Sequence, residues 1–137
     1  MRYTQKQLLE LTGMSFERLR HWRKEMPELA ARAGRGANYT FEEVAVLAVL
    51  SLAVDEIGLG TKVFAPFLTD LFAVFVDNDR VGDADMVLWF TADQVEIGPV
   101  DVLPDGNVVA MVRIEPVLAR LMARLRPVTP PQFILPL

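Results

Sequence analysis

The sequence predicts an α+β protein that is mostly α, with a helical first half followed by a small module of three strands and one helix. Apolar residues recur at helical spacing up to about residue 76. Beyond that point, short runs rich in Val, Ile and aromatic residues alternate with turn residues, as is typical of strands. Of the 137 residues, 52% are hydrophobic, which excludes a disordered chain. The length fits one compact domain or two small modules that share a core. We expect the two parts to be residues 1–76 and residues 77–137.

The chain opens with a short helix that ends at a glycine. Thr4 is a good N-cap, because its hydroxyl can accept a hydrogen bond from the first turn. Leu8, Leu9 and Leu11 supply an apolar stripe. Gly13 ends the helix, because glycine adopts the left-handed backbone conformation that a tight turn requires.

A second short helix follows directly, capped by Ser15. Phe16, Leu19 and Trp22 fall on one face of it, and we expect Trp22 in the core. Two short helices joined by a glycine turn form a helix-turn-helix. The second helix has the size that a DNA major groove admits.

A loop and a long apolar helix come next. The segment AARAGRGANYT, with its two glycines, predicts a loop or a small two-stranded wing. Thr40 and Glu43 have the spacing of a capping box, which predicts a third helix over residues 41–57. Its apolar run, residues 44–54, is too short to cross a bilayer and indicates a buried helix.

Two further helices are predicted from apolar spacing. A fourth helix is expected from Thr61 through Phe75. Pro116 suits the first turn of a last helix over residues 117–126. The residues expected on one side of this last helix are Leu118, Leu121, Met122 and Leu125.

Three strands are predicted over residues 86–92, 94–102 and 107–114, the last two joined by a Pro104-Asp105-Gly106 turn. The proline-rich tail cannot be regular structure. Its apolar residues are expected to pack on the chain or on a neighbouring subunit, with a partner-binding peptide as the alternative. These residues are Phe133, Ile134, Leu135 and Leu137.

The net charge of −4 hides an asymmetry along the chain. Residues 1–40 carry eight Lys or Arg and four Glu, a net charge of +4. The remaining residues carry six basic and fourteen acidic side chains, a net charge of −8. A basic head on an acidic body is the distribution expected of a polyanion-binding protein.

The basic charge of the head is concentrated on the second helix, in Arg18, Arg20, His21, Arg23 and Lys24. A solvated helix face is the simpler alternative. The preceding turn and the opposite charge of the rest of the chain favour contact with nucleic acid. We expect Arg18 and His21 to reach base edges. Arg20 and Arg23 are expected to hold phosphates.

The glycine-rich segment offers a second set of contacts. Arg35, Asn38 and Tyr39 could reach the DNA backbone or the minor groove beside the second helix, the alternative being an ordinary loop. Lys6 is a weaker candidate for a phosphate contact.

Other kinds of site are not indicated. The chain has no cysteine, which excludes a disulfide framework, a thiol nucleophile and a thiolate metal site. The stretch DNDRVGDAD lacks two of the ligands of a calcium loop, because Val81 and Leu88 occupy ligand positions. His21 is the only histidine, and no nucleophile and base are paired. We expect no enzyme, cofactor or metal ion.

Four segments in order resemble the MerR-type winged helix-turn-helix family. YTQKQLLELTGMS resembles the opening strand end, first helix and turn of that family, and FERLRHW resembles its recognition helix. RGANYT resembles its wing, and DEIGLGTKVF resembles the break before its fourth helix. The resemblance covers roughly residues 3–72.

The chain also departs from this family. His21 stands at one of two aromatic positions, and a strand-rich module replaces the long dimerisation helix usual there. The third helix lacks the usual charged face, so we expect it to be covered on several sides. The metal-sensing members use cysteines, which this chain lacks.

The resemblance implies binding to double-stranded DNA, and we expect a transcription regulator of bacterial or phage origin. We expect residues 77–137 to form a dimerisation or regulatory module and the protein to be a homodimer, because two half-sites about one helical turn apart strengthen the binding of a single head. The lack of cysteine fits the cytoplasm. MRYTQKQLLE lacks the apolar stretch of a signal peptide, so we expect neither a signal peptide nor membrane contact. RNA polymerase or another protein is left open as a partner of the C-terminal module. Two alternatives remain: a phage DNA-packaging (small terminase-like) or excisionase-like protein, and a protein-interaction module whose helix-turn-helix does not bind DNA.

Overall fold

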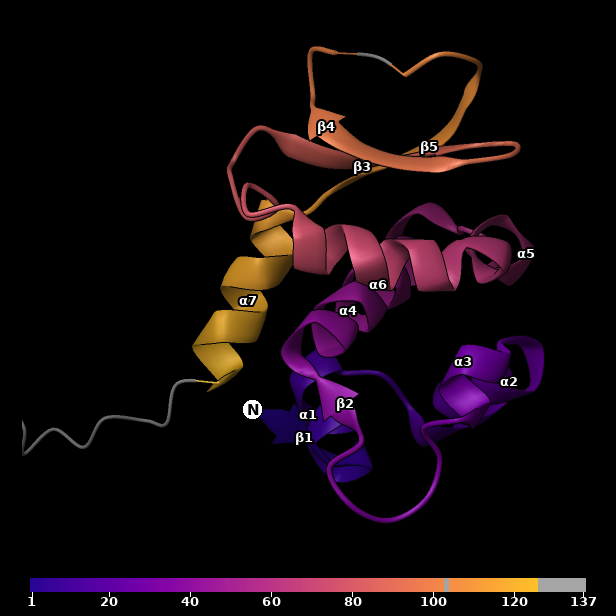
Figure 1. Ribbon diagram of the computed structural model, residues 1–137, viewed down its shortest axis with the longest axis vertical. Coiled ribbons are helices and arrows are strands. Elements are labelled where there is room, and N and C mark those ends of the chain that lie inside the picture. The colour runs from indigo at the N-terminus through magenta and orange to yellow at the C-terminus, as the bar shows by residue number, and fades with distance from the viewer. Residues whose placement is uncertain (103, 126–137) are drawn as a thin grey trace, which may run out of the picture.

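The computed structural model describes residues 1–102 and 104–125 (Figure 1). Its first part contains β1 (Arg2–Tyr3), α1 (Gln5–Thr12), α2 (Phe16–Glu25), α3 (Pro27–Ala30), β2 (Tyr39–Thr40), α4 (Phe41–Ile57), α5 (Thr61–Phe64), the 3-10 helix η1 (Ala65–Phe67) and α6 (Leu68–Asp77). Its second part contains β3 (Met86–Thr91), β4 (Val95–Pro99), β5 (Val108–Arg113) and α7 (Glu115–Leu125). The α+β fold, mostly α, is confirmed. The predictions for Phe133, Ile134, Leu135 and Leu137 lie outside the described residues.

The local signals that begin and end α1 and begin α2 are confirmed. The Thr4 hydroxyl accepts a hydrogen bond from the Gln7 backbone N–H at 3.2 Å, and the Gln7 side chain accepts one from the Thr4 N–H at 2.9 Å. Gly13 ends α1 with φ at 72°. The Ser15 hydroxyl accepts a hydrogen bond from a backbone N–H of the first turn of α2 at 3.1 Å. These contacts fix the helix-turn-helix geometry.

α4 is the central helix of the molecule, and α1, α6 and α7 pack against it (Figure 1). The predicted capping box joins Thr40 and Glu43 at its start, and Gly58 ends it with φ at 67°. Every residue from Glu43 to Ser51 is buried. The expectation of a buried third helix is therefore confirmed. No helix among the described residues has both the length and the apolar character needed to span a membrane.

The predicted fourth helix is interrupted. The structure has α5, then η1, then α6, where one continuous helix was expected. Pro66 lies in η1. Because proline has no backbone N–H and its ring clashes with the preceding helical turn, the helix breaks at this residue.

The glycine-rich segment is a loop, which is one of the two predicted alternatives. β2 pairs antiparallel with β1 at the start of the chain, with Arg2 opposite Thr40 and Tyr3 opposite Tyr39. The loop is thereby closed onto the N-terminus. The short helix α3 was not predicted. It begins at Pro27, whose fixed φ suits the first turn of a helix.

The three predicted strands form an antiparallel sheet in the order β4-β3-β5. The expected connection of the last two strands by a tight turn at residues 104–106 is wrong, because β4 and β5 lie on opposite sides of β3 and pair only with it. All six residues of β3 are buried. A strand with apolar side chains on both faces buries the most apolar surface when it lies in the centre of a sheet.

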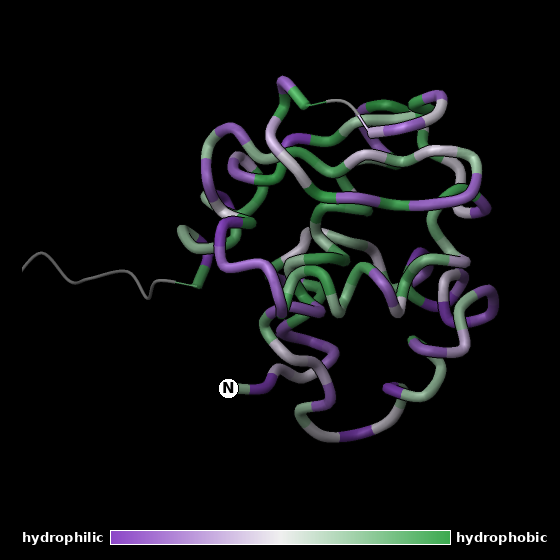
Figure 2. Tube along the Cα trace, turned by 45° about the horizontal axis from the view of Figure 1, so that its top comes forward, coloured by the Kyte–Doolittle hydropathy of each residue, from purple (hydrophilic) through white to green (hydrophobic). Residues whose placement is uncertain are grey.

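The sheet lies on the side of α6 and α4 that faces away from α1, α2 and α3 (Figure 1). One hydrophobic core joins the two halves of the chain: it includes Leu19 and Trp22 of α2, Leu88 and Phe90 of β3, and Leu121 of α7. Figure 2 shows hydrophobic stretches running through the middle of the molecule, from the helices into the strands.

On the buried side of α7, the structure has Val117 where Met122 was expected. Val117 and Leu121 are buried, whereas Met122 is 45% exposed. Val117 and Leu121 are four residues apart and lie one above the other on the helix, facing the core. Met122 lies to one side of this line.

Candidate nucleic-acid interface

α2 has a buried side and an exposed side. Leu19 and Trp22 are 0% and 2% exposed, and the Trp22 ring packs edge-on against Phe64 with ring centroids 5.3 Å apart. Phe16, expected on this buried face, is instead 47% exposed because it begins the helix, beyond the packed turn. Core packing therefore fixes which side of α2 faces solvent.

The exposed side of α2 carries three basic side chains, Arg20, His21 and Lys24, together with the acidic side chains of Glu17 and Glu25. The three basic side chains lie opposite Leu19 and Trp22 on the helix, because residues repeat every 3.6 positions per turn. His21 Nε2 lies 3.3 Å from Glu25 Oε1, one turn along the helix. Within the described part of the chain, Arg20 and Lys24 have no ion-pair partner. The side chains of Arg20 and Lys24 are therefore available to an anionic partner.

Arg18 lies on the flank of α2 and bonds to α4. Its Nη1 donates to Ser51 Oγ at 2.9 Å, and its Nη2 donates to Asp55 Oδ1 at 2.8 Å. The guanidinium carbon also lies 6.0 Å from the centroid of the Trp22 ring. The hydrogen bond from Arg18 lowers the pKa of Asp55 below its ordinary value. In this structure Arg18 positions α2 on α4, and a base contact would require it to leave Asp55.

Arg23 lies on the opposite flank and bonds to α1 and β2. Its Nη2 donates to Gln5 Oε1 at 2.7 Å and to the Tyr39 hydroxyl at 2.8 Å. Tyr39 is 0% exposed, so its side chain is not available for the expected DNA contact. Arg18 and Arg23 together hold α2 from both sides.

The predicted contact residues of the loop after α3 differ in their surroundings: Asn38 bonds to the loop's own backbone, whereas Arg35 faces solvent. Asn38 Nδ2 donates to the backbone carbonyls of Arg32, Gly34 and Arg35 at 3.1, 3.4 and 3.2 Å. Asn38 therefore shapes the loop. The Arg35 side chain is exposed on this loop. Lys6 is exposed on α1.

Arg32 is a structural residue that the sequence analysis did not single out. Its guanidinium forms an ion pair with Glu43 in the first turn of α4, donates to the Glu28 carbonyl, and lies over the Phe72 ring at 5.1 Å. The signal for this pair was the capping box, which places Glu43 at a buried helix start. Burial by itself raises the pKa of Glu43, but the hydrogen bonds from Arg32 and the Thr40 backbone outweigh it, so the pKa is lowered.

The substitution Arg32→Met should destabilise the protein by about 1–3 kcal/mol at pH 7, because it leaves the buried Glu43 carboxylate without its cation. In the native protein, the lowered pKa of Glu43 contributes stability that is present above its unfolded value of 4.5 and is lost as the pH falls through the folded pKa. The difference between the two proteins should therefore shrink at acid pH. Urea unfolding followed by circular dichroism from pH 3 to pH 7 measures it.

Arg35→Met is the matched control, since Arg35 lies exposed on the same loop. It should leave the unfolding midpoint almost unchanged. Equal destabilisation by both substitutions, or a difference that does not change with pH, would contradict the assigned role of the ion pair.

The acidic loop before β3 is held by its own cation. Arg80 Nε lies 2.8 Å from Asp83 and its Nη2 lies 3.7 Å from Asp85. Among residues 1–102 and 104–125, no group of three or more His, Asp or Glu side chains is placed to hold a metal ion.

Comparison with known families agrees with this geometry. Residues 3–63 match the model of the MerR HTH family regulatory protein. The match spans α1, α2, the loop, α4 and the start of α5. The chain matches no curated protein and no solved structure. The resemblance seen in the four sequence segments is confirmed over residues 3–63.

Proposed function

We propose that this chain, whose residues 3–63 match the model of the MerR HTH family regulatory protein, binds double-stranded DNA sequence-specifically as a transcription regulator of bacterial or phage origin. The observation that carries the proposal is the exposed side of α2. Arg20, His21 and Lys24 face solvent there, while Leu19 and Trp22 on the other side of the helix are packed in the core.

The dimensions and rigidity of α2 suit a recognition helix. It has 10 residues, about 15 Å of helix, and a major groove admits one α-helix. The hydrogen bonds of Arg18 to α4 and of Arg23 to Gln5 reduce the freedom of the helix before DNA arrives. Preorganisation of this kind lowers the entropic cost of binding.

The exposed cations take distinct roles in this proposal. His21 reaches a base edge, where its ring nitrogens can donate or accept hydrogen bonds. Arg20 and Lys24, which are one turn apart on the same side of α2, hold neighbouring phosphates. Arg35 on the loop and Lys6 on α1 extend the contact to the flanking backbone. Arg23 stabilises the helix and lies too deep to be a primary phosphate contact.

A homodimer completes the proposal. Two heads that read half-sites about one helical turn of DNA apart bind more tightly than one head alone. Residues 77–137 then serve as the dimerisation or regulatory module. Their acidic charge keeps this module away from the phosphate backbone.

Selection of binding sites from a random duplex library tests the proposal. The native protein should enrich a defined motif. His21→Ala should alter the preferred bases, because it removes a base contact. Arg20→Ala should weaken all sequences alike and reduce the salt slope by about 0.9 log unit per lost phosphate contact.

Lys62→Ala is the matched control, because Lys62 is an exposed cation on α5, outside α1 and α2, which form the helix-turn-helix. It should leave motif and affinity unchanged. If the native protein enriches no motif and binds random duplex no better at low salt than at high salt, the head is a protein-interaction module and the proposal is wrong.

A further inference from the structure

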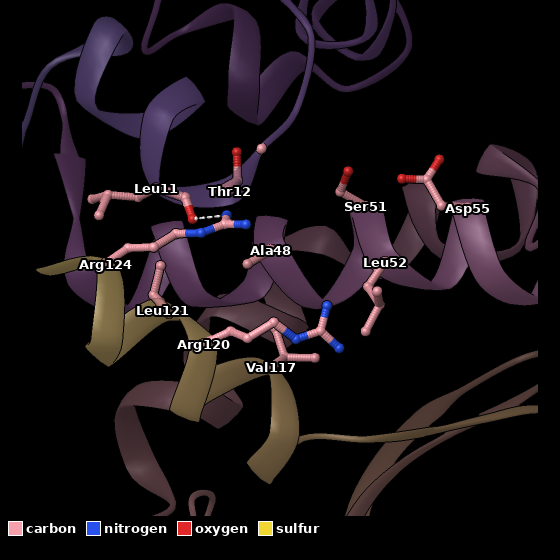
Figure 3. Close-up of a pocket in the computed structure, with 11 residues that line it drawn as sticks. Leu11, Thr12, Ala48, Ser51, Leu52, Asp55, Val117, Arg120, Leu121 and Arg124 are labelled. Atoms are coloured by element: carbon pink, nitrogen blue, oxygen red, sulfur yellow. Dashed lines mark hydrogen bonds between the residues drawn. The ribbon is translucent and has the colours of Figure 1, made fainter.

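A cavity of about 220 Å³ opens between α1, α4 and α7 (Figure 3). The end of α1 forms one of its walls, since Leu11, Thr12 and Gly13 line it. The smaller part of its accessible lining is apolar; we call this part the floor, and it comes from Leu11, Ala48, Leu52, Val117 and Leu121. Its rim is polar and carries Arg120, Arg124, Ser51 and Asp55.

Two guanidinium groups face this cavity from successive turns of α7. Arg120 and Arg124 are four residues apart, so they lie on the same side of the helix. Arg124 Nη1 donates to the Leu11 carbonyl at 2.8 Å, which leaves its other donors free for a ligand. Within the described residues, Arg120 has no ion-pair partner. The carboxylate on the rim, Asp55, is already paired with Arg18.

The geometry points to a binding site for a small organic anion: we propose that a carboxylate ligand with a short apolar body binds in this cavity. Its carboxylate would lie between Arg120 and Arg124, which can accept it with paired, charge-assisted hydrogen bonds. Its apolar body would lie on the floor lined by Leu52 and Leu121. A cavity of this size holds only a small molecule.

The site is placed to influence the recognition helix. Ser51 and Asp55 line the cavity, and both accept hydrogen bonds from Arg18 of α2. An anion held in the cavity repels the carboxylate of Asp55, which lines the same cavity, and weakens its contact with Arg18, which holds α2. Ligand binding therefore lowers DNA affinity. This coupling rests on the proposed function, whereas ligand binding itself does not.

Ligand binding is tested on the free protein, by titration followed by ¹H–¹⁵N NMR with hexanoate as the probe. Neutral 1-hexanol and inorganic phosphate serve as comparisons for the apolar body and the charge. Hexanoate should bind saturably, with the largest shifts at Gly13, Ser51 and residues 117–124. Arg120→Gln should weaken hexanoate binding about tenfold or more, because a charge-assisted contact is lost.

Lys62→Gln, which removes the same charge from a distant helix, should bind hexanoate as the native protein does. Arg124→Lys keeps the charge near Leu11 and should retain part of the affinity. The proposal is overturned if hexanoate does not bind saturably, if 1-hexanol or phosphate binds as well as hexanoate, or if Arg120→Gln binds hexanoate unchanged.

The coupling is then measured separately, by fluorescence anisotropy of a duplex carrying the selected motif. Saturating hexanoate should weaken DNA binding by the native protein and have no effect on Arg120→Gln. Hexanoate binding without a change in DNA affinity would overturn the coupling alone. Failure of both proteins to bind the duplex would instead count against the proposed function.

Discussion

The double substitution Arg20→Glu with Lys24→Glu is expected to reduce DNA affinity at least about a hundredfold while leaving the fold intact. Both side chains are exposed on the side of α2 that faces away from the core. In the proposed complex, each substitution would remove one charge-assisted phosphate contact and place a carboxylate near a phosphate. Fluorescence anisotropy of labelled duplexes at several salt concentrations measures the loss, and thermal unfolding confirms the fold.

A control with the same change in net charge separates local contact from long-range repulsion. Lys62→Glu with Arg113→Glu alters two exposed residues on α5 and β5, outside α2. This protein should lose only a small part of its affinity, because exposed charges beyond about 8–10 Å are largely screened at physiological salt. Equal losses in both double variants would show that net charge, and not the exposed side of α2, controls binding.

The features that the sequence predicted well depend on neighbours a few residues apart. The caps at Thr4, Ser15 and Thr40 and the left-handed glycines Gly13 and Gly58 all have their partners within one or two turns of chain. Backbone geometry at such a distance follows from residue type and spacing. The apolar run of α4 was equally clear, because few arrangements other than a buried helix accommodate it.

The features that the sequence did not predict depend on distant partners. Arg18 reaches Ser51 and Asp55, which are 33 and 37 residues away, and Arg23 reaches Tyr39, 16 residues away. From the sequence, these two arginines look no different from Arg20, which stays exposed. Only the packing of α2 on the core decides which cations are tied down.

The strand order is a second case of this kind. The turn at residues 104–106 favoured a hairpin between the last two strands, because Asp-Gly is a strong turn signal. The deciding feature was the burial of β3 on both faces, from Val87 and Trp89 on one side to Leu88 and Phe90 on the other. A sequence pattern that is apolar on both faces identifies a central strand but not its two neighbours.

A fragment that ends at Asp77 is expected to lose cooperative folding, although it contains the whole family match. Its α4 packs against α7 in the full protein. Six buried core residues come from the described part of the chain after Asp77: Leu88, Phe90, Val112, Ile114, Val117 and Leu121. Burying one such side chain contributes about 1.5–3 kcal/mol, so together they are comparable to the 5–15 kcal/mol of a typical domain.

Circular dichroism, urea unfolding and light scattering on the fragment test this expectation. Removing the strands and α7 exposes the apolar surface of α4, so the fragment should unfold without a sharp transition or aggregate. Full-length Leu121→Ala is the graded control, since Leu121 is 1% exposed. It should fold, with stability reduced by about 2–5 kcal/mol. A monodisperse fragment with a cooperative transition would contradict the shared core and make residues 1–76 an independent domain. In that case the loss of α7 would leave Arg18 and α2 in place, and the fragment would bind DNA without any response to hexanoate.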